Sequence, residues 1–186
     1  MSKNWVLIGV IALVVIIAIS AVSGYNGLVT LNENVNGKWS QVENQLQRRA
    51  DLIPNLVESV KGAAAQERQL IQSVTDARAK LAGAQGPVAK ATANDELSGA
   101  LSRLLVVVEN YPVMKTDQNF RQLTDELAGT ENRLAVARKD YNDSVQNYNT
   151  KIRTFPTNIY ASMLGFGQKE YFQAAESAKE VPKVKF

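Results

Sequence analysis

The chain has neither cysteine nor histidine among its 186 residues. The lack of cysteine excludes disulfides, thiol nucleophiles and a lipoprotein anchor, and the lack of histidine removes the usual general base. Together the two absences exclude every zinc site built from cysteine and histidine ligands. Only carboxylates, lysine, tyrosine, serine and threonine remain for chemistry, so we expect no metal, no cofactor and no small-molecule substrate.

Charge of a single sign is also scarce. The formal net charge is +3, and acidic and basic residues are interleaved along the chain. Nucleic-acid binding needs a concentrated basic surface, which this distribution does not provide. We therefore expect no nucleic-acid partner.

One long hydrophobic run is present, at residues 5–22, inside a stretch without charge from Lys3 to Glu33. As a helix it spans about 27 Å, just enough to cross the hydrocarbon core of a bilayer. A cleaved signal peptide is the alternative, because Ala18-Ile19-Ser20 resembles a cleavage site. The run is longer than a usual signal core, and the helical pattern continues to Leu28. Both facts favour a retained single-pass anchor in the lipid bilayer of the cell membrane.

Past this run, apolar residues recur every three or four positions, which is typical of a helix with one buried face. The pattern predicts one helix from about residue 25 to residue 81. Pro54 is expected to kink this helix without breaking it, because residues 51–56 lack glycine and are too apolar for an exposed turn. The stripe begins with Leu28, Leu31, Val35, Trp39, Val42, Leu46, Ala50, Ile53, Val57, Val60 and Ala64.

A second helix is predicted after a loop. Residues 83–93 contain two glycines and a proline, and they are expected to end the first helix and form a polar loop. Thr92 and Asp95 make a capping box for a helix over residues 94–111, which Pro112 ends.

A sevenfold repeat predicts a long helix over residues 116–155, with a coiled-coil-like seam. Pro156 stops it, and a short apolar helix follows before a turn at residues 165–167. A last helix is predicted from Gln168 to about Lys179, followed by a frayed tail at residues 181–186. The first row of the seam consists of Phe120, Leu127, Leu134, Tyr141, Tyr148 and Phe155.

Several sequence blocks resemble those of the LemA family, and in order they cover nearly the whole chain. They are Gln45-Leu46, residues 48–57, Val60-Lys61-Gly62, Glu109-Asn110-Tyr111-Pro112, Asn119-Phe120, Thr130-Glu131-Asn132, Ala137-Arg138, Tyr141-Asn142, Tyr148-Asn149, Phe155-Pro156 and Tyr171-Phe172. The resemblance implies an antiparallel helical bundle on a membrane anchor, in agreement with the periodicity. It implies no particular reaction. The chain departs from the family pattern at Met114 and in the loop at residues 82–93.

The two indications of membrane orientation disagree. Lys3 lies before the hydrophobic run and Lys38 is the nearest cation after it. The positive-inside rule then favours an internal amino terminus and an exported bundle. The resemblance implies the opposite, with the short amino terminus outside, so both orientations stay open.

The fold prediction is therefore all-α: an antiparallel helical bundle of three to four long helices with an N-terminal transmembrane helix. The expected domains are an anchor at residues 1–24, a bundle at residues 25–180 and the tail at residues 181–186. The residues predicted as an interaction or structural signature are Trp39, Arg48, Arg49, Asp51, Pro54, Asn55, Glu109, Tyr111, Glu131, Arg138, Tyr141, Asn142, Tyr148 and Asn149.

Two interpretations compete for the signature cations, Arg48 and Arg49. In the first, they bind anionic lipid or an acidic partner. In the second, they pair with helix carboxylates such as Glu109 or Glu131. On a continuous helix they stand about 40 Å beyond Val22, which favours pairing. The same reasoning applies to the other signature arginine.

The aromatic and amide residues of the signature also have a structural interpretation. Trp39 lies on the stripe, so a core position is favoured over a partner-facing one. The Tyr141-Asn142 pair recurs as Tyr148-Asn149, which places both carboxamides on one side of the seam. They form either a binding ladder or interhelix hydrogen bonds, and we favour the latter.

The only carboxylate constellation consists of Glu109, Glu126 and Glu131. A di-iron bundle site also needs histidine, and paired-carboxylate hydrolysis needs a cleft that a heptad-packed bundle does not indicate. We therefore predict no catalytic residue and no enzyme activity.

The favoured function is a membrane-anchored, non-catalytic helical scaffold that binds a protein partner. A signalling adaptor of a membrane sensor and an accessory subunit of a membrane peptidase are the alternatives. Self-association is a further hypothesis, because the apolar surface of residues 104–108 spreads around its helix.

Overall fold

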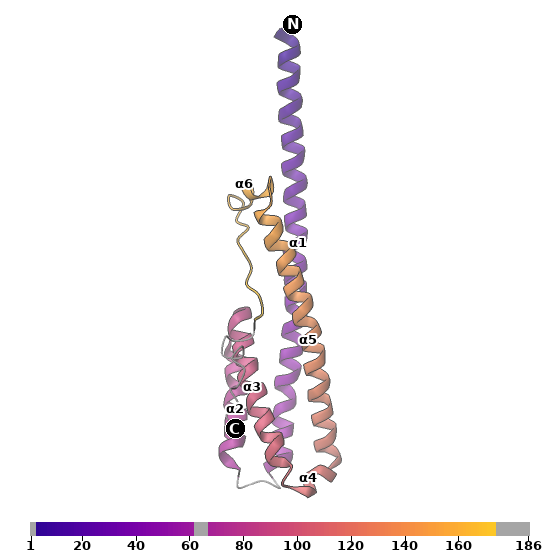
Figure 1. Ribbon diagram of the computed structural model, residues 1–186, viewed down its shortest axis with the longest axis vertical. Helices are drawn as coiled ribbons and strands as arrows, with labels where there is room; N and C mark the ends of the chain where they lie inside the picture. Colours follow the sequence, from indigo (N-terminus) through magenta and orange to yellow (C-terminus); the bar gives the residue numbers. More distant parts are fainter. Residues whose placement is uncertain (1–2, 62–66, 174–186) are drawn as a thin grey trace, which may run out of the picture. The chain divides into compact units, whose positions relative to one another are not determined.

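The computed structural model describes residues 3–61 and 67–173. All regular secondary structure in these two ranges is helical, which confirms the all-α prediction (Figure 1). The helices are α1 (Lys3–Lys61), α2 (Arg68–Gly83), α3 (Gly86–Val108), α4 (Pro112–Thr116), α5 (Gln118–Arg153) and α6 (Thr157–Ala161).

The chain divides into two compact units. Unit 1 consists of residues 1–38 and 143–169, and unit 2 of residues 39–142 and 170–186. Helices α1 and α5 contribute one part to each unit.

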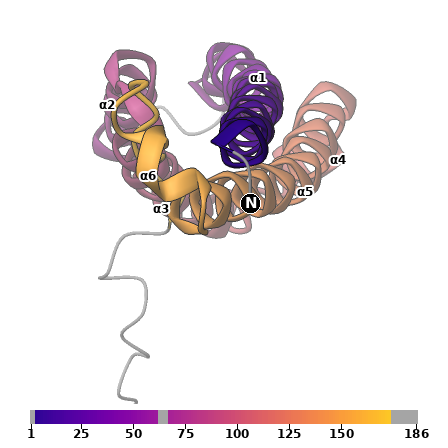
Figure 2. The ribbon, with the colours of Figure 1, turned by 90° about the horizontal axis from the view of Figure 1, so that it is seen from above.

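Unit 2 holds the larger core. Its α2 and α3 form a hairpin, connected by only two residues, and lie side by side in both ribbon views (Figures 1 and 2). The stripe on α1 and the seam on α5 add further buried surface, as do Met114 of α4 and Phe172. Fully or almost fully buried core residues include Val42, Leu46, Ile53, Leu56, Val60, Val74, Leu81, Leu97, Leu104 and Leu134.

The single helix predicted over residues 25–81 is wrong. Helix α1 ends at Lys61 and α2 begins at Arg68, while residues 62–66 lie outside the described ranges. The apolar stripe did not reveal the break between the two helices, because it includes buried residues on both: Val60 of α1 and Val74 of α2 are completely buried. Helix α1 does continue through Pro54, so the prediction that this proline would not break the helix is confirmed.

The polar loop predicted over residues 83–93 is also wrong. Helix α3 already begins at Gly86, whose φ of 78° is left-handed and therefore suits glycine. Pro87 lies in the first turn, where its missing N–H and fixed φ favour a helix start. Thr92 is no cap, since its hydroxyl donates to the Val88 carbonyl (3.2 Å) within the helix. The predicted stop before Pro112 is confirmed, because α3 ends at Val108.

The long helix after Asp117 is confirmed. The Asp117 carboxylate accepts a hydrogen bond from the Phe120 amide (2.7 Å) and so caps the first turn of α5. The seam is buried from Phe120 to Tyr148. Phe155 is 75 % exposed, because α5 ends at Arg153 and the residue no longer follows the helical repeat.

The end of the chain differs from the prediction. The short helix α6 and the turn at Gly165 (φ 82°) are present, but residues 166–173 contain no helix. The helix predicted from Gln168 is therefore wrong as far as residue 173, and the remainder of it, with the tail at 181–186, lies outside the described residues.

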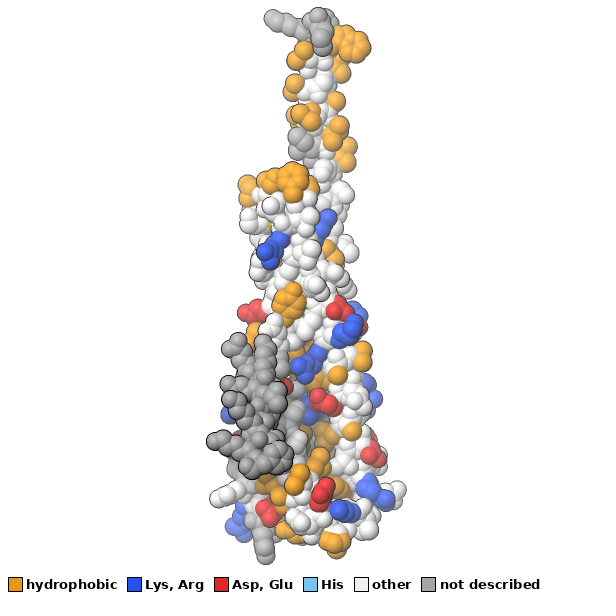
Figure 3. Space-filling model, viewed as in Figure 1, with side chains coloured by type: hydrophobic (Ala, Val, Ile, Leu, Met, Phe, Trp, Pro, Cys, Tyr) orange, Lys and Arg blue, Asp and Glu red, His pale blue; other side chains and the backbone are white. Residues whose placement is uncertain are grey.

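The hydrophobic run forms part of α1. Among the described residues, α1 is the one helix long and apolar enough to cross a membrane, by length and composition. The described large apolar side chains of this run, such as Trp5, Leu13 and Val22, are exposed (Figure 3).

Replacing Leu134 by alanine is expected to lower the free energy of unfolding by about 2–5 kcal/mol, through lost burial and a cavity. Leu134 is completely buried on α5, whereas Val136 on the same helix is 62 % exposed. Val136→Ala should therefore stay within about 0.5 kcal/mol of the parent chain. Urea unfolding of the two variants measures the difference, and equal losses would show that the seam lies on another face of α5.

Candidate functional site

A buried arginine forms the polar centre of unit 2. Arg49 on α1 is 5 % exposed, and its Nη1 donates to the Oδ1 of Asn94 on α3 (2.8 Å). The same nitrogen lies 2.5 Å from the Glu131 carboxylate on α5. The predicted pairing of Arg49 with Glu131 is thus confirmed, and one side chain links three helices.

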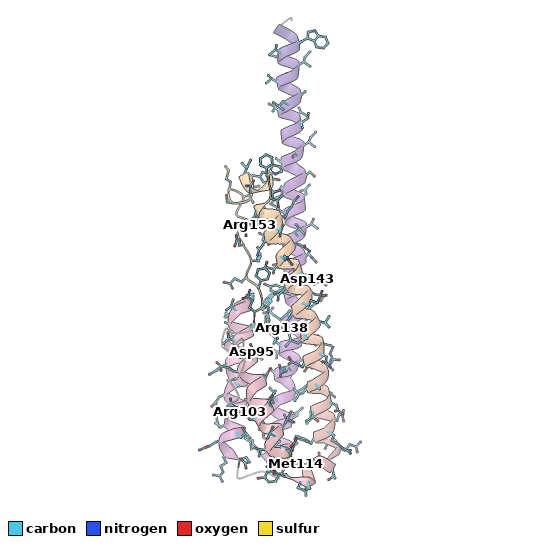
Figure 4. The ribbon with its side chains drawn as sticks, viewed as in Figure 1. Asp95, Arg103, Met114, Arg138, Asp143 and Arg153 are labelled. Atoms are coloured by element: carbon cyan, nitrogen blue, oxygen red, sulfur yellow. The ribbon has the colours of Figure 1, made fainter. Side chains whose placement is uncertain are left out.

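The charges around Arg49 act in opposite directions. Burial lowers the pKa of Arg49, and the Glu131 and Asp95 carboxylates oppose this, while the positive charge of Arg138 lowers the pKa further. Asp95 lies on α3 and Arg138 on α5 (Figure 4). Within the described residues, Arg49 Nε and Asn94 Nδ2 are buried without a hydrogen-bond partner. Because such atoms cost free energy, the centre positions helices but is not their main source of stability.

Other signature residues on α1 face outward. Arg48, Asp51, Pro54 and Asn55 are all exposed. Asp51 accepts a hydrogen bond from Gln47 Nε2 (2.7 Å) on the same helix. Arg48 lines an open depression of about 650 Å³ whose walls carry both charge signs: Gln118, Arg121, Gln122, Asp125, Glu126, Gly129 and Arg133.

An aromatic cluster lies at the edge of unit 2. The Trp39 ring, which is half-buried, lies 5.2 Å from the Tyr141 ring and 6.3 Å from that of Phe172. The Arg138 guanidinium stacks 4.8 Å from the Phe172 ring centre. Trp39 and Arg138 therefore make contacts inside the chain, although Trp39 is half-buried and not a fully buried core residue.

Two asparagines hold the extended segment at residues 169–172 by its main chain. In unit 2, Asn142 Nδ2 donates to the Phe172 carbonyl (3.0 Å), and the Phe172 amide donates to Asn142 Oδ1 (2.9 Å). In unit 1, Asn149 makes the same pair of bonds with Lys169, both at 2.9 Å. We call these pairs the asparagine clamps. The prediction that these carboxamides bond to another helix is wrong. Their partner is the main chain of an extended segment.

The spacing of the clamps matches two regular structures. Seven residues of an α-helix rise about 10.5 Å, and three residues of extended chain rise about 10 Å. Asn142 and Asn149 are seven apart, and their partners Phe172 and Lys169 are three apart in the opposite direction. Both carboxamides bind main-chain atoms only, so this attachment does not depend on the side chains of the segment.

The tyrosines beside the clamps are core residues, as predicted. Tyr141 is 3 % and Tyr148 1 % exposed, and the Tyr141 hydroxyl donates to the Glu170 carbonyl (2.8 Å). Burial, followed by the nearby Glu170 charge, raises the pKa of Tyr141 to about 12. Burial also raises the pKa of Tyr148.

The carboxylates considered for chemistry do not converge. Glu109 is exposed in the turn after α3, Glu126 lines the open depression and Glu131 pairs with Arg49. Arg49 therefore pairs with Glu131 and not with Glu109. The Tyr111 hydroxyl, from the same sequence block as Glu109, donates a hydrogen bond to Glu67 Oε1 (3.4 Å). Across residues 3–61 and 67–173, no group of three potential metal-ligating side chains occurs.

Sequence reasoning missed Asn94 and the segment at residues 169–172. Asn94 carried a signal, because it is a polar residue in the apolar frame of Ala91 and Leu97. The main-chain partners of the clamps carried none, since any residue supplies an amide and a carbonyl.

Comparison with known sequences decides the family. The sequence profile of the LemA family matches residues 38–186. The chain belongs to the LemA family. All fourteen signature residues, from Trp39 to Asn149, lie inside the matched region, whereas the hydrophobic run at residues 5–22 precedes it.

Four relatives match most of the chain. Magnetosome proteins MamQ 1 and MamQ 2 of Paramagnetospirillum magneticum are each 31 % identical, over 89 % of this chain and 70 % of theirs. Magnetosome protein MamQ of Magnetospirillum gryphiswaldense is 29 % identical, over 80 % of this chain and 64 % of its own. Protein LemA of Metamycoplasma hominis is 26 % identical, over 81 % and 69 % respectively.

In this LemA-family chain, removing one clamp should release one amide selectively. Asn142→Ala is expected to speed hydrogen exchange of the Phe172 amide several-fold, since a hydrogen bond contributes about 1 kcal/mol. Asn149→Ala should do the same for Lys169. Asn147, exposed on the same helix, provides the matched control, and Asn147→Ala should leave both rates unchanged. Unchanged exchange in all three variants would contradict the clamps.

Alkaline pH should destabilise the protein partly through Tyr141. Its protonated hydroxyl is favoured in the fold, so its contribution is complete below the ordinary pKa of 10.0 and is lost as pH rises towards 12. Thermal melts of Tyr141→Phe and the parent chain should differ by a constant amount below about pH 9 and converge above pH 10. A constant difference across the whole range would show that the hydroxyl titrates normally.

Proposed function

We propose that this LemA-family protein is a membrane-anchored, non-catalytic helical scaffold. The observation that carries the proposal is the change in burial along α1. Its first part exposes large apolar side chains, and its later part packs into a bundle in which Arg49 binds Asn94 and Glu131. A helix of this kind joins a membrane segment to a rigid protein surface.

The exposed run supports the anchor. Side chains such as Trp5 (73 % exposed) and Ile19 (64 % exposed) gain about 25 cal/mol for each Å² of apolar surface removed from water. None of the residues that the structure describes buries this run, and residues 5–22 have the length of a hydrocarbon core. A bilayer supplies the missing apolar environment. A single pass through the cell membrane follows as the arrangement we propose.

The state of the signature residues supports a non-catalytic role. A catalytic site needs titratable groups that converge on a concave surface and are free to act on a substrate. Here Arg49 is bound to Asn94 and Glu131, and both clamp asparagines are bound to main chain. The depression beside Arg48 is open to solvent and carries mixed charge.

The names of the relatives are consistent with a scaffold whose role depends on the protein that it binds. Two groups of relatives, the magnetosome proteins and Protein LemA, share this sequence over most of its length under different names. A scaffold whose own residues perform no reaction suits more than one assembly. The exposed Leu105 and Val106 on α3 give it an apolar surface through which copies of the chain associate.

The full-length chain should stay in the membrane fraction after extraction with alkaline carbonate or high salt, because its anchor spans the bilayer. A chain lacking residues 1–24 should appear in the soluble fraction. Release of the full-length protein by carbonate, or a mature amino terminus near Ala21, would contradict the anchor.

Affinity capture from detergent-solubilised membranes tests the scaffold role on the same full-length protein. Recovery of the chain with copies of itself or with a partner protein supports it, and Val106→Glu should reduce that recovery without loss of helical circular dichroism. Recovery of the chain alone, sedimenting as a monomer, would contradict it.

A further inference from the structure

Unit 1 exposes a second apolar surface, separate from the run at residues 5–22. It surrounds the end of α5 and the short helix α6, where orange side chains gather in the space-filling view (Figure 3). The exposed fractions are 75 % for Phe155, 59 % for Ile159, 83 % for Met163 and 50 % for Leu164. We call these four residues the α6 patch. Four large apolar side chains this exposed within ten residues are unusual for a surface that faces only water.

The segment that carries the α6 patch packs against α1 at residues 24 and 25. A Cβ placed on Gly24 would overlap the Tyr160 hydroxyl, so the backbone of α1 and the Tyr160 side chain are in direct contact. One residue further along, the Tyr25 ring lies 5.8 Å from the Phe166 ring in an edge-to-face arrangement. The two contacts fix α6 and the following turn beside residues 24 and 25.

That level coincides with the end of the hydrophobic run. Val22 is the last residue of the run, and two or three residues of helix correspond to about 3–5 Å. The headgroup region on each side of the hydrocarbon core is several ångströms deep, since the whole bilayer is about 40–45 Å thick and its core about 30 Å. A bilayer placed around residues 5–22 therefore has its headgroup layer at the level of α6.

The charges near the patch fit the same location. From residue 144 to residue 169 the sequence has three cations and no aspartate or glutamate. Lys151 and Arg153 lie exposed in the last turn of α5, where Figure 4 labels Arg153 near α6. Cations beside exposed aromatic and aliphatic residues are typical of segments that lie in the interface of a membrane with anionic lipids.

We infer that the α6 patch is a membrane-docking site, with its apolar side chains inserted at the boundary between headgroups and acyl chains. Lys151 and Arg153 then face lipid phosphates. The inference rests on the proposed anchor at residues 5–22 and adds a second, interfacial contact. Unit 1 is thereby attached to the bilayer at two places, which restricts rotation and tilt of α1 in the membrane.

The absence of native cysteine allows a direct test with single labels. Met163→Cys, Ile159→Cys, Leu13→Cys and Val136→Cys are introduced separately into the full-length protein and carry an environment-sensitive fluorophore. Ile159, Leu13 and Val136 are matched, because they are apolar and 59 %, 58 % and 62 % exposed. The proteins are reconstituted into vesicles of phosphatidylcholine and phosphatidylglycerol in equal amounts, and circular dichroism verifies the helical content of each.

Labels at positions 163 and 159 should show blue-shifted emission, quenching by lipids with a quencher near the headgroup, and protection from aqueous iodide. The label at position 13 should be quenched by lipids with a quencher deep in the acyl chains. The label at position 136, in unit 2, should be quenched by iodide alone. Replacing both Lys151 and Arg153 by glutamine should weaken lipid quenching at position 163 in these vesicles.

The outcomes separate the two proposals. Lipid quenching at position 13 with iodide quenching at positions 159 and 163 would overturn the docking site and leave the anchor in place. Absence of lipid quenching at position 13 would overturn the anchor, and the docking site with it. Protection of positions 159 and 163 from both iodide and lipid quenchers would show that protein covers the patch, which also overturns docking to lipid.

Discussion

Burying the apolar stripe of α1 requires partner helices along most of its length, because each large aliphatic side chain gains about 1.5–3 kcal/mol when it leaves water. In unit 2 this requirement brings the α2–α3 hairpin and α5 against α1. In unit 1, Tyr160 of α6 and Phe166 after it contact α1 at Gly24 and Tyr25, and Leu28 is completely buried. Towards the amino terminus the stripe widens to the whole circumference of the helix, and protein cover gives way to exposed apolar surface.

The polar residues inside this apolar frame restrict how the helices are arranged. A buried arginine is costly unless its partners are placed around it, so Arg49 is compatible only with packing that brings Asn94 and Glu131 to it. Apolar contacts alone tolerate several relative positions of two helices. The Arg49 contacts exclude most of them, and they do so without making the site reactive.

Periodicity in the sequence predicted whatever depends on burying a helical face. The seam on α5 was correct from Phe120 to Tyr148, and the class of fold followed from it. Periodicity could not locate the chain reversal before α2, because the stripe continues in phase across it. It also failed at Gly86-Pro87, where two residues that usually break helices begin one instead. The partner of Arg49 was predictable from charge, whereas the main-chain partners of Asn142 and Asn149 have no sequence signature.

The asparagine clamps bind the segment through main-chain atoms alone, so their spacing suits any two of its residues that are three apart. A slip of the segment by three residues would present other amides and carbonyls to both asparagines, so the residue-specific contacts must select the alignment: the Phe172 ring lies 6.3 Å from the Trp39 ring and 4.8 Å from the Arg138 guanidinium. The two asparagines thus hold an extended main chain alongside a helix, because seven residues of helix and three of extended chain cover nearly the same distance; the side chain of Phe172 decides which residues lie there.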